Sequence, residues 1–281
     1  MNNTHKKLTL GYSTCPNDTF IFYALAHKLI NSIGIEFNIQ LEDVETLNQN
    51  AKKNLFDVSK LSFAAIGHLN KTYGLLRSGG ALGRGCGPLI VSRPGYDLTK
   101  LTSKKIAVPG IWTTAYMLLG LYLKSSSEAV PLPFEMIMPA VQNKTFDFGV
   151  IIHEGRFTYQ EYGLVSLVDL GQWWESKTSL PIPLGGIAIH RKHEKNLAKK
   201  VETIIKNSLM YAFNNQEKTK NYVKKHAQEM SESVIRQHID LYVNEFSIDI
   251  GEEGEKAIDL LFSMSKKQGL IPDYNTSIFA C

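Results

Sequence analysis

Cysteine is scarce in this sequence, with three in 281 residues, at Cys15, Cys86 and Cys281. An odd number of widely separated cysteines argues against a disulfide framework and favours a reducing compartment. Cys15 has no obvious base in the nearby sequence, which favours a packed thiol over a nucleophile. The first ten residues lack the apolar segment and the cleavage site of a secretory signal. We therefore expect a cytoplasmic protein.

Long apolar runs and dense clusters of one charge are also missing. No apolar run approaches the roughly 20 residues that a helix needs to cross a bilayer, so we expect no membrane contact. The 31 basic and 27 acidic residues lack the basic stripe with interleaved aromatics that is typical of a nucleic-acid surface. The glycines do not follow a nucleotide-binding spacing, and the histidines form no zinc pattern. We therefore expect a small-molecule partner and no metal site.

The composition that remains is that of a globular protein with room for two domains. Apolar residues make up 43% of the chain and charged residues 21%. Short apolar strands alternate with helical segments, which predicts an α/β fold with mainly parallel sheets. The expected strands are residues 8–13, 35–41, 58–61, 89–92, 105–108, 148–152 and 187–190, and helices are expected at 19–30, 44–53, 63–70, 114–123, 139–144, 217–230, 231–244 and 251–267. Between residues 197 and 212, apolar residues recur at spacings of three and four, which also predicts an amphipathic helix.

Two glycine-containing segments beside strands indicate where the chain passes between two lobes. Residues 77–88 contain five glycines and lead directly into an expected strand, and a second such junction lies near 184–190. We predict that residues 1-92 with 187-281 form the first lobe and residues 93-186 the second. Nearly extended crossings near 86-93 and 184-190 would then form a hinge.

A strand, a glycine turn and a helix start with two threonines occupy residues 106–119. Thr113 and Thr114 stand in the first turn of this expected helix. Free N–H groups and the positive end of the helix dipole favour an anion there, and the hydroxyls add donors. Ordinary capping of the helix is the alternative interpretation.

His153 comes just past the apolar strand 148–152. In an open α/β sheet the carboxyl ends of the strands face the ligand crevice, so an imidazole at this position suits acid–base chemistry. The alternative is a histidine that is only hydrogen-bonded or that lies at the surface. Glu154 could orient the imidazole, or could point the opposite way if the strand alternation continues.

The segment that begins at Lys60 follows another strand, and Ser62 would open the next helix. If Ser62 faces the two threonines across a cleft, it could bind the other end of a substrate, with helix capping as the alternative. Asn17 and Asp18 follow the first strand and carry the same two interpretations, and Asp18 is well placed as the N-cap of the helix after it.

Six short segments carry a resemblance to a known family. They are STCPNDTF at 13–20, LEDVETLN at 41–48, KLS at 60–62, RSGGALGRG at 77–85, TTAY at 113–116 and HEGRFTY at 153–159. In order and spacing, across nearly the whole chain, they closely resemble the 1,4-dihydroxy-6-naphthoate synthases of the futalosine route to menaquinone.

The resemblance implies a two-lobed fold like the type II periplasmic binding proteins, with two crossover strands as hinge and a discontinuous first lobe. It implies a lyase that cleaves cyclic dehypoxanthinyl futalosine, a small substrate with a carboxylate, to 1,4-dihydroxy-6-naphthoate, without a metal or an organic cofactor. The residues that it implies in the site are His153 as proton acceptor and Lys60, Leu61, Ser62, Thr114 and Ala115 as substrate contacts.

Two other functions remain compatible with such a fold. A solute-binding receptor for a small anion is the first, because fold alone does not assign function. The missing signal peptide argues against it. Chorismate dehydratase of the same pathway is the second, and the segment 153–159 favours the naphthoate synthase over it. The sequence does not specify an oligomeric state.

Overall fold

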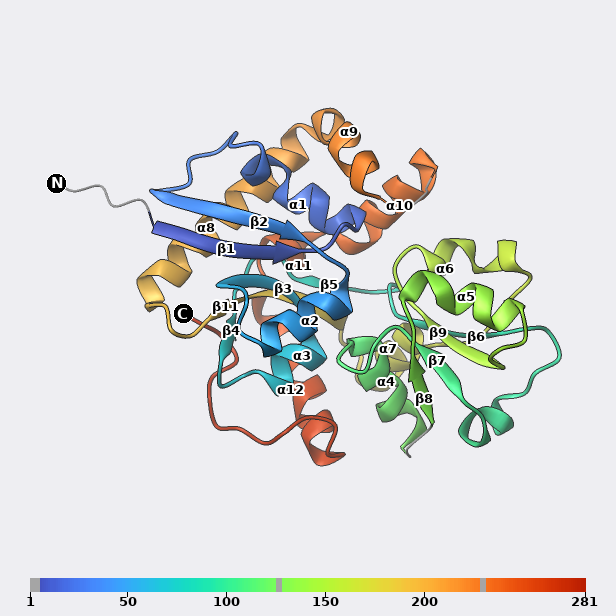
Figure 1. Cartoon of the computed structure of the whole chain (residues 1–281). Coiled ribbons are helices and arrows are strands. Elements are labelled where there is room, and N and C mark those ends of the chain that lie inside the picture. The colour runs from blue at the N-terminus through green and yellow to red at the C-terminus, as the bar shows by residue number, and fades with distance from the viewer. Residues whose placement is uncertain (1–5, 125–127, 228–230) are drawn as a thin grey trace.

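The structure is a computed structural model, and it describes residues 6–124, 128–227 and 231–281. Two mixed β-sheets lie side by side, and helices pack against each of them (Figure 1). The predicted two-lobed α/β class is therefore confirmed. Within the described residues, no helix combines the length and the apolarity needed to cross a membrane.

The first sheet contains strands from both ends of the chain, in the order β2-β1-β3-β11-β4, with β5 paired to β11. Its strands are β1 (Lys6–Tyr12), β2 (Ile35–Leu41), β3 (Val58–Ser62), β4 (Tyr73–Leu75), β5 (Ala81–Gly83) and β11 (Ile182–His190). β1 pairs parallel with β2 and β3, whereas β11 runs antiparallel to β3, β4 and β5.

The second sheet has the order β10-β6-β9-β7-β8 and comes from the middle of the chain. Its strands are β6 (Leu89–Ser92), β7 (Ile106–Val108), β8 (Ala129–Pro131), β9 (Phe148–Ile151) and β10 (Val165–Asp169). β7 pairs parallel with β8 and β9, but β6 runs antiparallel to β9 and β10. The prediction of mainly parallel sheets is therefore wrong, because a strand's direction depends on where its connection enters the sheet and not on its own apolar pattern.

Helices surround both sheets. They are α1 (Pro16–Ala26), α2 (Val44–Lys52), α3 (Phe63–His68), α4 (Thr114–Leu123), α5 (Phe134–Gln142), α6 (Gly155–Thr158), α7 (Leu170–Thr178), α8 (Lys195–Asn214), α9 (Gln216–His226), α10 (Glu232–Tyr242), α11 (Glu245–Ile248) and α12 (Gly251–Lys267), with 3-10 turns η1 (Leu98–Ser103) and η2 (Tyr159–Tyr162). The helix expected at 139–144 is α5, which begins earlier and contains Pro139. The last three residues of the helix expected at 217–230 lie outside the described residues.

The start of α1 differs from the expected one. The helix begins at Pro16, which can occupy the first helical position because the N–H it lacks would have no intrahelical partner there. Cys15 is therefore the N-cap residue, and Asp18 lies inside the first turn. The prediction that Asp18 caps this helix is wrong, so its carboxylate is available for other partners.

The chain passes between the two sheets twice. The first passage, residues 84–88, overlaps the predicted crossing near 86-93. The second lies just before Ile182, earlier than the predicted 184–190, because β11 already pairs with β5 from that residue onward. Gly185 and Gly186 allow close strand packing in the first sheet, since a Cβ on Gly186 would lie 2.5 Å from Leu75.

The exact division into lobes stays a prediction. With the predicted boundary after residue 92, β6 falls in the first lobe, but its hydrogen-bonded neighbours are β9 and β10 of the second sheet.

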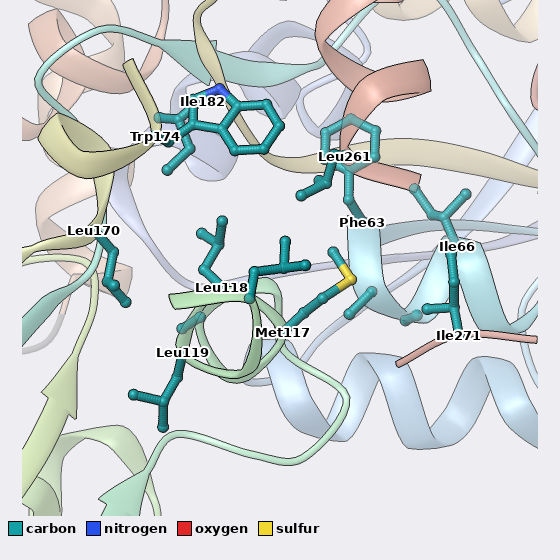
Figure 2. Close-up of a cluster of buried hydrophobic side chains, with 14 of the residues drawn as sticks. Phe63, Ile66, Met117, Leu118, Leu119, Leu170, Trp174, Ile182, Leu261 and Ile271 are labelled. Atoms are coloured by element: carbon teal, nitrogen blue, oxygen red, sulfur yellow. The ribbon is translucent and has the colours of Figure 1, made fainter. Parts of the chain in front are cut away.

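A buried apolar cluster joins helices of the two sheets. Figure 2 shows side chains of α3 and α12, which pack near the first sheet, beside side chains of α4 and α7. The labelled members are Phe63, Ile66, Met117, Leu118, Leu119, Leu170, Trp174, Ile182, Leu261 and Ile271. This packing holds the body of α4 against α3, so the N-terminus of α4 has a defined position relative to the end of β3.

Candidate active site

A cavity lies between strand ends and helix starts of the two sheets. All nine residues predicted for the site line it, namely Asn17, Asp18, Lys60, Leu61, Ser62, Thr113, Thr114, Ala115 and His153. Sequence reasoning did not assign the other lining residues, which are Ser13, Val44, Ala81, Cys86, Pro88, Ile152, Leu184, Gly185 and Tyr242. The glycine-rich segment 77–88 signalled part of this set, whereas no local pattern marked Tyr242 on α10.

A buried ion pair forms one side of the cavity. The Lys60 Nζ atom lies 3.0 Å from the Asp18 Oδ1 atom, and the two side chains are 7% and 2% exposed. Lys60 also donates to the Gly79 carbonyl, while Asp18 accepts from the Ser13 amide and hydroxyl and from the Asn17 side chain. An ammonium group has three donors, so Lys60 retains one for a ligand in the cavity.

Ser62 ends β3 and stands at the N-cap position of α3. Its hydroxyl makes no capping hydrogen bond to that helix. Instead, the Ser62 Oγ atom accepts from the Asn48 side chain at 3.1 Å. Of the two interpretations of Ser62, this geometry favours a side chain available to a ligand over a helix cap.

The N-terminus of α4 faces the same cavity from the second sheet. Thr113 is the N-cap and donates its hydroxyl hydrogen to the Gly110 carbonyl, at 2.7 Å. Thr114 donates its hydroxyl hydrogen to the Leu184 carbonyl, at 2.6 Å. Within the described residues, the Thr114 and Ala115 amides donate to no protein acceptor. The available anion donors are therefore these amides, and not the two hydroxyls.

The engagement of Thr114 changes what its substitution should do. We expect Thr114→Val to lower the free energy of unfolding by about 1–3 kcal/mol, because the partly buried Leu184 carbonyl loses its donor. Affinity for a carboxylate should fall less than it would if the Thr114 hydroxyl were itself a ligand donor, since the helix amides remain. Urea denaturation would measure the first effect, with Thr203→Val on the exposed face of α8 as control. Equal stability of the two variants would contradict the structural role of the Thr114 hydroxyl.

His153 follows β9 with its backbone in the left-handed region, at φ 53°. This conformation is uncommon for a residue other than glycine and turns the chain from the strand into α6. The His153 Nδ1 atom lies 3.5 Å from the Cys15 Sγ atom, which leaves Nε2 for the substrate. The ring also contacts Phe134 edge-on and stacks near His238, with centroids 5.3 and 6.1 Å away.

Comparison with known proteins identifies the family of this chain. A family model described as menaquinone biosynthesis matches residues 8–267. A curated 1,4-dihydroxy-6-naphthoate synthase from Thermus thermophilus is 47% identical over 94% of this chain and 95% of its own length. The chain belongs to the 1,4-dihydroxy-6-naphthoate synthase family. A second synthase, from Streptomyces coelicolor, is 41% identical with the same coverage, so the chain is an enzyme of menaquinone biosynthesis.

Solved structures agree with the fold of this synthase family. A crystal structure of an Archaeoglobus fulgidus protein, 33% identical, superposes with a TM-score of 0.88 over 94% of this chain and 98% of that chain. The periplasmic aliphatic sulphonate binding protein of Escherichia coli has 12% identity and a TM-score of 0.67, over 97% of this chain and 90% of its own. The second likeness shows the periplasmic-binding-protein fold alone.

The electrostatic surroundings of His153 determine the charge of its imidazole. Burial disfavours the imidazolium form and lowers the pKa of His153 to about 4, and the Lys60 ammonium acts in the same direction. The Asp18 carboxylate opposes this shift. The imidazole is uncharged at neutral pH and can accept a proton there.

Glu154 lies close to His153 without a hydrogen bond to it among the described residues. Burial raises the pKa of Glu154 to about 7, so this carboxyl is near half-protonation at neutral pH. Glu154, Cys15 and His153 each bring a potential metal-ligand atom within 4.8 Å of the others. The spacing could hold a metal ion, but burial raises the pKa of the Cys15 thiol well above its usual value. A metal ion would have to displace that proton.

Proposed function

We propose that this cavity is the site where the chain converts cyclic dehypoxanthinyl futalosine to 1,4-dihydroxy-6-naphthoate, with His153 as general base. The observation that carries the proposal is the shared cavity: an uncharged imidazole at the end of β9 faces the same space as the free amides of α4. The curated relatives named for this product provide the reaction. We place the reaction in the cytoplasm, because scattered free cysteines suit reducing surroundings.

The proposed chemistry needs one proton acceptor and accurate positioning. The His153 Nε2 atom takes a proton from the saturated ring of the substrate, and the electron pair of that C–H bond enters the ring as it becomes aromatic. The carbon–carbon bond to the departing fragment breaks, and this fragment keeps the bonding electrons and takes up a proton from the imidazolium. Aromatisation supplies driving force, so the protein contributes orientation and proton transfer. As the imidazolium forms, the nearby Asp18 carboxylate stabilises the new positive charge.

Substrate binding divides between the two sheets. The carboxylate of the substrate would accept from the Thr114 and Ala115 amides at the positive end of α4. The Ser62 hydroxyl and the remaining donor of Lys60 would hold it from the first sheet. Asn17 and Asp18 would influence the charges of Lys60 and His153 rather than contact the carboxylate of the substrate. Their own polar atoms already bind each other and Ser13, Lys60 and His238.

Incubation with defined substrates tests this function. We expect the purified protein to release 1,4-dihydroxy-6-naphthoate from cyclic dehypoxanthinyl futalosine, detected by mass, and to leave chorismate unchanged. Dehydration of chorismate would identify the sister reaction of the pathway instead. Binding of the futalosine compound without turnover would indicate a receptor, and both results would overturn the proposal.

A further inference from the structure

Asn48 on α2 is a polar side chain that is 0% exposed and that lies behind the cavity wall. Its Oδ1 atom accepts from the Ser62 backbone amide at 3.0 Å. Its Nδ2 atom donates to the Ser62 Oγ atom at 3.1 Å, and the Trp112 carbonyl and the Glu45 Oε2 atom each lie 3.3 Å from it as further acceptors. One side-chain amide therefore contacts two places: the end of β3 in the first sheet, and the loop that connects β7 of the second sheet to α4.

These contacts determine how the Ser62 hydroxyl can act. A backbone N–H can only donate, so the oxygen of Asn48 must face the Ser62 amide and its nitrogen must face the Ser62 Oγ atom. An amide nitrogen cannot accept, so the Ser62 hydroxyl hydrogen points elsewhere. Because this hydroxyl does not cap α3 and lines the cavity, its hydrogen is available to an anion there.

The second contact positions the N-terminus of α4. Trp112 directly precedes Thr113, the N-cap of that helix. The Trp112 indole stacks on His68 of α3 with centroids 4.8 Å apart, and the Lys52 ammonium lies 5.0 Å from the ring centroid. The loop is therefore held against α2 and α3, and the Trp112 carbonyl accepts from the same Asn48 side chain that contacts Ser62.

We propose that Asn48 is a positioning residue. It orients the Ser62 hydroxyl as a donor and keeps this hydroxyl at a fixed position relative to the free amides of α4. A carboxylate is then bound by both sheets at once, through groups that one buried side chain aligns. Asn48 itself does not touch the substrate. This inference rests on the proposed function, since it concerns how the substrate carboxylate is bound.

A double-mutant cycle tests the proposal on KM and on the Kd of naphthalene-2-carboxylate, measured by calorimetry. We expect Asn48→Ala and Ser62→Ala each to weaken binding about tenfold, as the loss of a hydrogen bond to a charged group does. If Asn48 acts through Ser62, the double variant should be much less than a hundredfold weaker than wild type. A fully additive, hundredfold loss would overturn the proposal.

Two further variants separate positioning from folding. Asn48→Asp preserves the volume and the acceptor for the Ser62 amide, but its carboxylate would draw the Ser62 hydroxyl hydrogen away from the cavity. We expect it to bind at least as weakly as Asn48→Ala, and an Asn48→Asp protein that binds like wild type would contradict the positioning role. Asn50→Ala, on the same helix and without a side-chain hydrogen bond among the described residues, should bind like wild type. Absence of turnover by wild type would refute the proposed function, while the binding cycle would still decide the role of Asn48.

Discussion

Replacing His153 by asparagine is expected to lower turnover about 10²- to 10⁴-fold while substrate still binds, because a well-placed general base contributes that much to the rate. Asparagine has similar reach but cannot accept a proton near neutral pH. The values of kcat and KM, followed by product mass, would show a loss in kcat with little change in KM.

A control histidine makes this result specific. His226 lies on α9 and does not line the cavity, so a His226→Asn protein should keep wild-type turnover. A folded His153→Asn protein that retains more than about a tenth of wild-type turnover would contradict the role of His153, given the size expected of a general base. Attention would then move to Glu154 or to Asp18.

The pH dependence of kcat/KM distinguishes His153 from Glu154. The base must be deprotonated, so the rate falls as pH drops through its pKa. If His153 is the base, its pKa of about 4 means that the rate at pH 5.5 should remain near the rate at neutral pH. If Glu154 were the base, its pKa of about 7 would leave only about 3% of its carboxyl groups ionised at pH 5.5, and the rate would fall accordingly. Circular dichroism at each pH would confirm that the protein stays folded.

Replacing Lys60 by methionine should destabilise the fold by about 3–5 kcal/mol, because it leaves the buried Asp18 carboxylate without its countercharge. The hydrogen bonds from Ser13 and Asn17 remain, but they do not supply a positive charge. The same change removes a donor from the cavity, so carboxylate binding should weaken as well. Urea denaturation and calorimetry would measure the two effects separately.

A second substitution identifies the cause of this loss. Asp18→Asn in the Lys60→Met background removes the unpaired charge and should recover part of the stability, as expected when a buried pair is replaced as a unit. Lys7→Met, which breaks the exposed pair with Glu36, should leave stability nearly unchanged. A Lys60→Met protein as stable as Lys7→Met would show that the Asp18 charge is satisfied without Lys60.

Local signals predicted where the candidate site residues would lie. His153 could be placed at a strand end and Thr113 at a helix start because each signal lies within a few residues of its position: an apolar run, a glycine turn, a hydroxyl. The rule that ligands bind at the carboxyl ends of strands then brought these positions together. The same local logic failed at α1, where Pro16 displaced the expected cap at Asp18.

By itself, the sequence determined the α/β class and the approximate positions of many strands and helices, because strand and helix periodicity and turn chemistry act over a few neighbouring residues. Together with the family resemblance, it also gave nine of the residues that line the cavity. Only the tertiary structure decided the directions of β6 and β11, the ion pair of Lys60 with Asp18 and the contact of Asn48 with Trp112. It also decided the lowered pKa of His153. These properties depend on burial and on partners tens of residues away, and desolvation and hydrogen bonding arise only when the folded chain brings such groups together.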